Sequence, residues 1–122
     1  MTELLSILIP VRDEKDNVYS ISNEIKKKIE NSNYEIVFIN DFSKDSTVKE
    51  LIKLSESDHK IVYYDNKKKG LGGAIDLGIK KSKGKYICIM MSDNSDTVGD
   101  LNSYYKEISS GNFDAVFGSR FI

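Results

Sequence analysis

Five short apolar runs alternate with amphipathic stretches along the chain, and this alternation restricts the fold more than any other feature of the sequence. The runs are residues 4–9, 34–39, 61–64, 86–91 and 115–117. After the first run, Val18, Ile21, Ile25 and Ile29 recur at spacings of three and four residues, which is typical of a helix with one apolar face. The same periodicity predicts helices around residues 48–52, 74–79 and 101–108.

Repeated alternation of strands and helices predicts right-handed crossovers between parallel strands. We therefore predict an α/β fold, a three-layer α/β/α sandwich around a mainly parallel sheet. The length of 122 residues agrees with a single domain that spans residues 1–122.

Charge and cysteine content exclude several classes of function. The 18 basic and 19 acidic residues leave no surplus of positive charge for a phosphate backbone, so nucleic-acid binding is disfavoured. The one cysteine, Cys88, makes no internal disulfide, which fits a cytoplasmic protein. The longest apolar run, residues 86–91, is far shorter than the roughly 20 residues that a membrane-spanning helix needs.

Ligands of parallel α/β sheets bind beyond the carboxyl ends of the strands, so the residues that follow each run are candidates for function. Carboxylates follow the first, second and fourth runs, within residues 10–14, 40–45 and 92–96, and Arg120 follows the fifth. Asp45 and Asp96 are each accounted for as a helix cap or turn residue. As a set, however, these acids would meet at one edge of the sheet, where oxygen ligands favour a divalent cation that in turn binds a phosphate or diphosphate.

The glycines at positions 70, 72 and 73 leave two interpretations open. They lack the Gly-Lys-Ser/Thr ending of a phosphate-binding loop, and they follow the third run instead of opening the chain as a dinucleotide fingerprint does. One interpretation is a tight turn with close packing of the next helix, and the other is contact with a ligand.

Motifs at the ends of the predicted strands occur in an order that is known from one family. They are residues 7–14, 39–47, 70–74, 91–93, and 111–114 with 118–120. Together they resemble the family 2 glycosyltransferases, in particular the dolichol-phosphate (polyprenyl-phosphate) mannosyltransferase-like branch. The resemblance implies the GT-A fold, Mg²⁺ or Mn²⁺ as cofactor, and transfer of a sugar from a GDP- or UDP-sugar to an acceptor such as a polyprenyl phosphate. It also implies work at the cytoplasmic face of a membrane.

The resemblance assigns the nucleotide contacts to two segments. Pro10, Arg12 and Glu14 match the first nucleotide-contacting loop of the family. Ile39 and Asp41 match the pair that receives the base and the ribose.

It assigns the diphosphate and metal contacts to the later part of the chain. Ser92 and Asp93 match the last two positions of an Asp-X-Asp motif whose final Asp binds the metal. Ser95 falls where a second metal-side ligand is common, and Arg120 matches an arginine that approaches the phosphates. A bound metal would neutralise the leaving diphosphate.

The sequence departs from the family pattern at three positions and in its length. Met91 stands at the first Asp of the Asp-X-Asp motif, Arg12 stands where an aromatic residue is common, and Asn40 replaces the first of two usual Asp residues. The family's catalytic domain is longer, and its later part supplies the acceptor site and any catalytic base. We therefore expect a donor-binding half, truncated after the fifth strand, with no catalytic residue assigned. Its uncovered sheet edge favours self-association into a homo-oligomer.

Two alternatives stay open. A pseudo-enzyme or fragment would bind the nucleotide-sugar and transfer nothing, which Met91 and the short chain favour. A phospho-accepting receiver domain would also have five strand–helix units in a chain of this length. Asp13, Glu14 and Asp65 match its acidic positions in part, but Arg120 follows the fifth strand where that class has a lysine.

Overall fold

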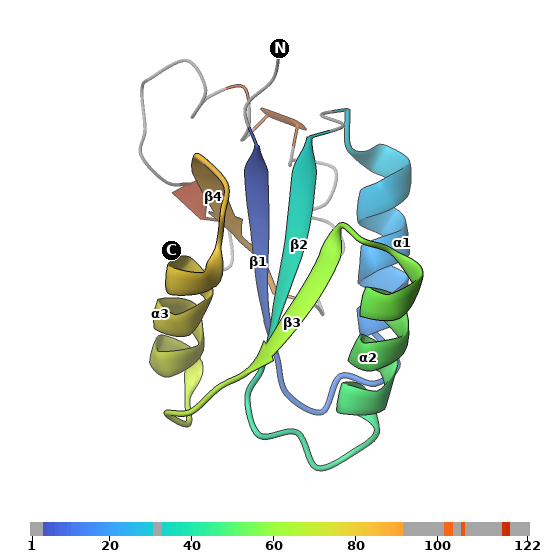
Figure 1. Ribbon diagram of the computed structural model, residues 1–122, viewed down its shortest axis with the longest axis vertical. Coiled ribbons are helices and arrows are strands. Elements are labelled where there is room, and N and C mark those ends of the chain that lie inside the picture. Colours follow the sequence, from blue (N-terminus) through green and yellow to red (C-terminus); the bar gives the residue numbers. More distant parts are fainter. Residues whose placement is uncertain (1–3, 31–32, 92–101, 104–105, 107–115, 118–122) are drawn as a thin grey trace.

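The computed structural model describes residues 4–30, 33–91, 102–103, 106 and 116–117, and strands and helices alternate along them (Figure 1). The strands are β1 (Leu5–Val11), β2 (Tyr34–Asn40), β3 (Ile61–Asp65), β4 (Tyr86–Ile89) and β5 (Val116–Phe117). The helices are α1 (Val18–Lys28), α2 (Thr47–Ser57) and α3 (Leu71–Lys81). No helix in the described ranges has the length and apolar character to cross a membrane. The predicted alternation is confirmed.

All four neighbouring strand pairs are parallel, and the strand order is β3-β2-β1-β4-β5. From β1 the chain steps outward through β2 to β3, then crosses back to place β4 on the other side of β1. The direction of winding therefore reverses between β1 and β4, which makes this the topological switch point of the sheet. A receiver domain has the order 2-1-3-4-5, so the observed topology excludes that alternative.

The helices cover both faces of the sheet, with α1 and α2 on one side and α3 on the other (Figure 1). Successive side chains of a strand point to opposite faces. Accordingly Ile7 packs in one buried cluster with Ile21 and Leu51, whereas its neighbour Leu8 packs in the other with Ala74. The predicted three-layer α/β/α sandwich is confirmed.

The glycines near the start of α3 serve the turn and the packing of the helix. Gly70 has a φ of +117°, which a residue with a side chain rarely adopts. A Cβ atom on Gly73 would lie 2.1 Å from the carbonyl oxygen of Lys68. The structural interpretation of the glycine cluster, a tight turn with close packing of the next helix, is therefore correct for Gly70 and Gly73.

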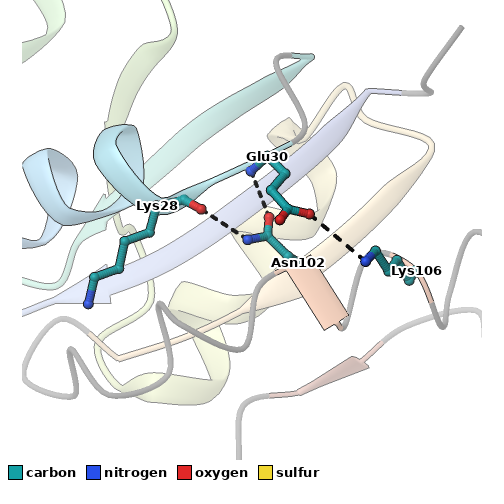
Figure 2. Close-up of polar contacts among 4 residues, drawn as sticks. All are labelled: Lys28, Glu30, Asn102 and Lys106. Atoms are coloured by element: carbon teal, nitrogen blue, oxygen red, sulfur yellow. Dashed lines mark hydrogen bonds and ion pairs between the residues drawn. The ribbon is translucent and has the colours of Figure 1, made fainter.

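Asn102 joins the later part of the chain to the carboxyl end of α1 (Figure 2). Its Nδ2 donates to the carbonyl oxygen of Lys28 at 2.9 Å, and its Oδ1 accepts from the backbone N–H of Glu30 at 2.7 Å. The side chains of Lys106 and Glu30 add an exposed ion pair at 3.9 Å. Residues 102, 103 and 106 are helical, in agreement with the expected fourth helix. The apolar residues that predict it, Leu101, Tyr104, Tyr105 and Ile108, lie outside the described residues.

Candidate functional site

Asp13 holds together the two loops that follow β1 and β2. Its Oδ1 accepts hydrogen bonds from the backbone N–H groups of Lys44 at 2.6 Å and Asp45 at 3.2 Å, and its own N–H donates to Ser43 Oγ at 3.0 Å. Asp13 has a φ of +52°, a left-handed conformation that the short polar side chain of Asp tolerates better than most. The two loops therefore form one structural unit at the carboxyl edge of the sheet.

Thr47 connects this unit to the first turn of α2. Its Oγ1 accepts from the backbone N–H of Glu14 at 2.9 Å and donates to Asp45 Oδ1. The backbone N–H of Thr47 donates to the same carboxylate oxygen at 2.8 Å. The hydrogen bond from the Thr47 hydroxyl is the largest cause of a lowered pKa for Asp45, and the one from the Thr47 backbone N–H acts in the same direction. Asp45 therefore lies one position before the N-cap residue Ser46 and closes the turn that leads into α2, in agreement with its interpretation as a helix cap or turn residue.

Two amide–carboxylate pairs join the ends of β2 and β3. Asn40 Nδ2 donates to Asp65 Oδ1 at 3.0 Å, and Asn66 Nδ2 donates to Asp41 Oδ1 at the same distance. The amide lies on β2 in the first pair and beyond β3 in the second. An ionised Asp at position 40 would have no hydrogen to donate to Asp65, which accounts physically for the departure from the family pattern at Asn40.

Asp41 is almost fully buried, with 7% of its surface exposed, and it also fixes the start of α3. Its Oδ1 accepts a second hydrogen bond from the backbone N–H of Gly70 at 3.0 Å. Within the described residues, no hydrogen bond reaches its Oδ2. Among the described residues, the carboxylate of Asp41 is therefore held through Oδ1 alone.

A pocket of about 270 Å³ lies at the switch point between β1 and β4, and we call it the switch-point pocket. Its lining residues come from the ends of β1, β2 and β4 and from the start of α3. They are Pro10, Val11, Arg12, Asp41, Gly70, Leu71 and Met91. Open α/β sheets bind their ligands at this position, because here the connections leave the switch point in opposite directions and open a crevice.

Three of the predicted nucleotide-contacting residues, Pro10, Arg12 and Asp41, line the switch-point pocket. The other two do not. Glu14 Oε2 accepts from Asn17 Nδ2 at 2.5 Å, so this side chain closes the turn before α1. Ile39 has no exposed surface and packs in the buried cluster beneath α3. The remaining predicted site residues, Ser92, Asp93, Ser95 and Arg120, lie outside the described residues.

Sequence reasoning missed Asn66, Leu71 and Val11. Asn66 lies two positions after the third apolar run, at a strand end that is not among the candidates above although the same argument applies to it. Leu71 has 46% of its surface exposed and lies within the glycine cluster, which is the signal that could have found it. Val11 extends the first strand, and no feature of the sequence distinguishes it from a core residue.

The described part of the chain contains no group of three or more His, Cys, Asp or Glu side chains placed to hold a metal ion. Asp41 is the only carboxylate among the lining residues of the switch-point pocket. Mg²⁺ and Mn²⁺ prefer oxygen ligands, and the thioether of Met91 does not provide one. The metal site at Asp93 and Ser95 stays a prediction.

The family model for glycosyl transferase family 2 matches residues 6–122. An uncharacterized glycosyltransferase of Rickettsia bellii is 36% identical over 110 residues, which are 89% of this chain and 16% of that protein. A dolichol-phosphate mannosyltransferase of Pyrococcus furiosus is 29% identical over 97% of this chain and 33% of that protein. A dolichyl-phosphate beta-glucosyltransferase of Dictyostelium discoideum is 31% identical over 95% of this chain and 39% of that protein. The chain therefore spans less than two fifths of the length of these relatives.

Solved structures share the architecture at low sequence identity. The mannosyltransferase PcManGT from Pyrobaculum calidifontis, in complex with GDP-Man and Mn²⁺, has a TM-score of 0.68 at 14% identity over 76% of this chain and 28% of its own. TarS 1-349 of S. aureus, in complex with UDP-GlcNAc, has a TM-score of 0.67 at 19% identity over 88% of this chain and 32% of its own. These likenesses establish the fold, which is the GT-A fold that the sequence motifs led us to expect.

Proposed function

The chain belongs to glycosyl transferase family 2, and from this membership we propose that it is the donor-binding part of a glycosyltransferase whose switch-point pocket binds a nucleotide-diphosphate sugar. One observation carries the proposal. Pro10, Arg12 and Asp41 are separated by up to 31 positions in the chain, yet they line one pocket at the switch point of the sheet. That is where this class of sheet binds nucleotides.

The chemistry of the lining suits the parts of such a donor. Asp41 supplies an acceptor for an N–H group on the edge of a uracil or guanine base. Arg12 is exposed and carries a guanidinium, which binds phosphate oxygens with paired hydrogen bonds. Leu71 and Met91 supply apolar surface for the base or the ribose. In this proposal Glu14 and Ile39 support the loop and the strand that carry the contacts.

The proposed cofactor is Mg²⁺ or Mn²⁺, with Asp93 and Ser95 as ligands, Ser92 beside them and Arg120 near the phosphates. When bound, the cation would stabilise negative charge on the departing diphosphate. The neighbouring structure that contains GDP-Man and Mn²⁺ supports this choice. We propose a polyprenyl phosphate as acceptor, in line with the names of the P. furiosus and D. discoideum relatives, and hence action at the cytoplasmic face of a membrane.

Calorimetric titration of UDP- and GDP-sugars, with Mn²⁺ and with EDTA, tests the donor and the metal together. We expect one of the two donors to bind in a Mn²⁺-dependent manner. Asp93→Ala should remove the metal-dependent part of the affinity, whereas Asp96→Ala, a change of the same kind three positions away, should keep it. Circular dichroism shows whether both variants are folded. Failure of both donors to bind in the presence of Mn²⁺ would contradict the proposal.

A second candidate function is binding of the nucleotide-sugar without transfer. Met91 favours it, because an apolar side chain lines the pocket where the family has the first Asp of its Asp-X-Asp motif. A transfer assay with a radiolabelled donor sugar and polyprenyl phosphate, run beside the titration, separates the two. Binding without any labelled lipid product would favour the second candidate.

A further inference from the structure

Asn66 is buried, and both ends of its side-chain amide are used. Its Nδ2 donates to Asp41 Oδ1 at 3.0 Å and to the carbonyl oxygens of Lys68 at 2.7 Å and Gly70 at 3.3 Å. Its Oδ1 accepts from the backbone N–H of Lys68 at 3.3 Å. These partners determine the orientation of the amide, because a flipped amide would place its oxygen against a carboxylate and two carbonyls.

The orientation of Asn66 determines in turn how Asp41 is presented. Asn66 Nδ2 and the Gly70 N–H both donate to Oδ1 of Asp41, which holds the plane of the carboxylate in place. Asp41 lines the switch-point pocket, whereas Asn66 does not. The oxygen that stays available for a ligand is Oδ2. A ligand group that completes its hydrogen bonding is a donor, such as an N–H of a nucleotide base.

We propose that Asn66 is a positioning residue for base recognition, and this inference rests on the proposed function. By holding Oδ1 of Asp41, it presents Oδ2 to the ring N–H of a uracil or guanine base. The diphosphate part of the ligand does not contact Asp41 Oδ2 in this proposal, so its own affinity does not depend on how Asn66 orients the carboxylate. Asn66 therefore contributes to the affinity for a nucleoside diphosphate and not to the affinity for diphosphate alone.

The chain offers a matched control in the neighbouring pair of Asn40 and Asp65. The distance between amide nitrogen and carboxylate oxygen is 3.0 Å here as well, and Asn40 is as buried as Asn66, at 6% exposure for both. Neither Asn40 nor Asp65 lines the switch-point pocket. Asn40→Asp and Asn66→Asp therefore each place a second carboxylate against an Asp at the same edge of the sheet. The partner is the exposed Asp65 in the first variant and the buried Asp41, the proposed base acceptor, in the second.

The test compares the unsubstituted chain with Asn66→Asp, Asn66→Ala and Asn40→Asp. The affinities of UDP, GDP and inorganic diphosphate are measured by calorimetry in the presence of Mn²⁺. We expect both Asn66 variants to lower the ratio of nucleoside diphosphate affinity to diphosphate affinity by about tenfold, the equivalent of one hydrogen bond. Asn40→Asp should leave this ratio unchanged. Asn66→Ala adds no charge, so it keeps the test available if Asn66→Asp does not fold.

The outcomes distinguish the two proposals. If the unsubstituted chain binds neither UDP nor GDP more tightly than diphosphate, the proposed function and the role of Asn66 are both overturned. If it does prefer one of them and the Asn66 variants keep that preference, only the role of Asn66 is overturned. An equal loss of affinity for nucleoside diphosphate and diphosphate would show a purely structural role, which overturns the inference as well.

Discussion

The Oδ1 atom of Asp41 accepts a hydrogen bond from the backbone N–H of Gly70 at 3.0 Å, and this contact ties the end of β2 to the first turn of α3. Gly70 reaches the carboxylate through a left-handed turn with a φ of +117°. The same carboxylate lines the switch-point pocket. Asp41 thus supports the structure and, in the proposed function, also contacts the ligand, so the two roles need variants that separate them.

Asp41→Asn provides this separation. The amide oxygen of Asn can still accept from Gly70 and Asn66, while an NH₂ group replaces the oxygen that faces a ligand N–H. We expect near-normal stability in urea and an affinity for the preferred nucleoside diphosphate that falls about 5- to 150-fold, because an unpaired buried polar group costs about 1–3 kcal/mol. Asp41→Ala should reduce stability and affinity together. Unchanged affinity in the Asn variant would leave Asp41 with a turn-forming role only.

Met91→Asp adds a carboxylate to the lining of the switch-point pocket. It restores the first acidic position of the family's metal motif, so we expect Mn²⁺-dependent donor binding to become tighter. Titration of the donor at several Mn²⁺ concentrations measures the change, and Met91→Leu is the control for the loss of the thioether. An Asp variant no tighter than the Leu variant would mean that position 91 does not reach the metal.

Two glycines of α3 should respond in opposite directions to substitution by alanine. A Cβ on Gly78 would lie 2.3 Å from Leu8 Cδ1, and Leu8 is fully buried and has no room to move. Gly78→Ala should therefore destabilise the chain by about 1–3 kcal/mol. A Cβ on Gly72 would meet no atom within 4 Å apart from its chain neighbours and the backbone of its own helix. Gly72→Ala should therefore stabilise the helix by about 0.5–1 kcal/mol. Urea unfolding measures both, and equal effects would contradict the close approach of α3 to β1.

The lowered pKa of Asp45 predicts a loss of stability in acid. The hydrogen bond from the Thr47 hydroxyl, its largest cause, favours the ionised carboxylate. The stabilisation is therefore fully present above the ordinary carboxyl pKa of about 4 and disappears as the pH falls through the lower pKa of the folded state. Asp45→Asn removes the titrating group. Between pH 7 and pH 3 the free energy of unfolding should fall less in this variant than in the unsubstituted chain, and an equal fall would show that Asp45 is not involved.

Periodicity along the chain was enough to predict most of the secondary structure. The apolar runs at residues 34–39 and 61–64 differ from β2 and β3 by a single residue at the carboxyl end. The run at 86–91 overestimates β4, which ends at Ile89. Met90 is nonetheless buried, with 1% of its surface exposed. An apolar run reports burial, and burial continues past the last residue that pairs in a sheet.

Local pattern also identified Pro10, Arg12 and Asp41, because each lies at or just beyond the carboxyl end of a strand and such ends can be recognised one at a time. What the sequence by itself determined was therefore the set of elements, their parallel arrangement and the candidates at each strand end. Only the tertiary structure decided the strand order β3-β2-β1-β4-β5, which excludes a receiver domain and brings Met91 beside Arg12 in one pocket. Only the tertiary structure revealed the hydrogen bond from Asn66 to Asp41, two residues that are 25 positions apart in the sequence. Strand order and such pairings depend on packing between distant segments, whereas hydrophobic periodicity reflects only which face of each segment is buried.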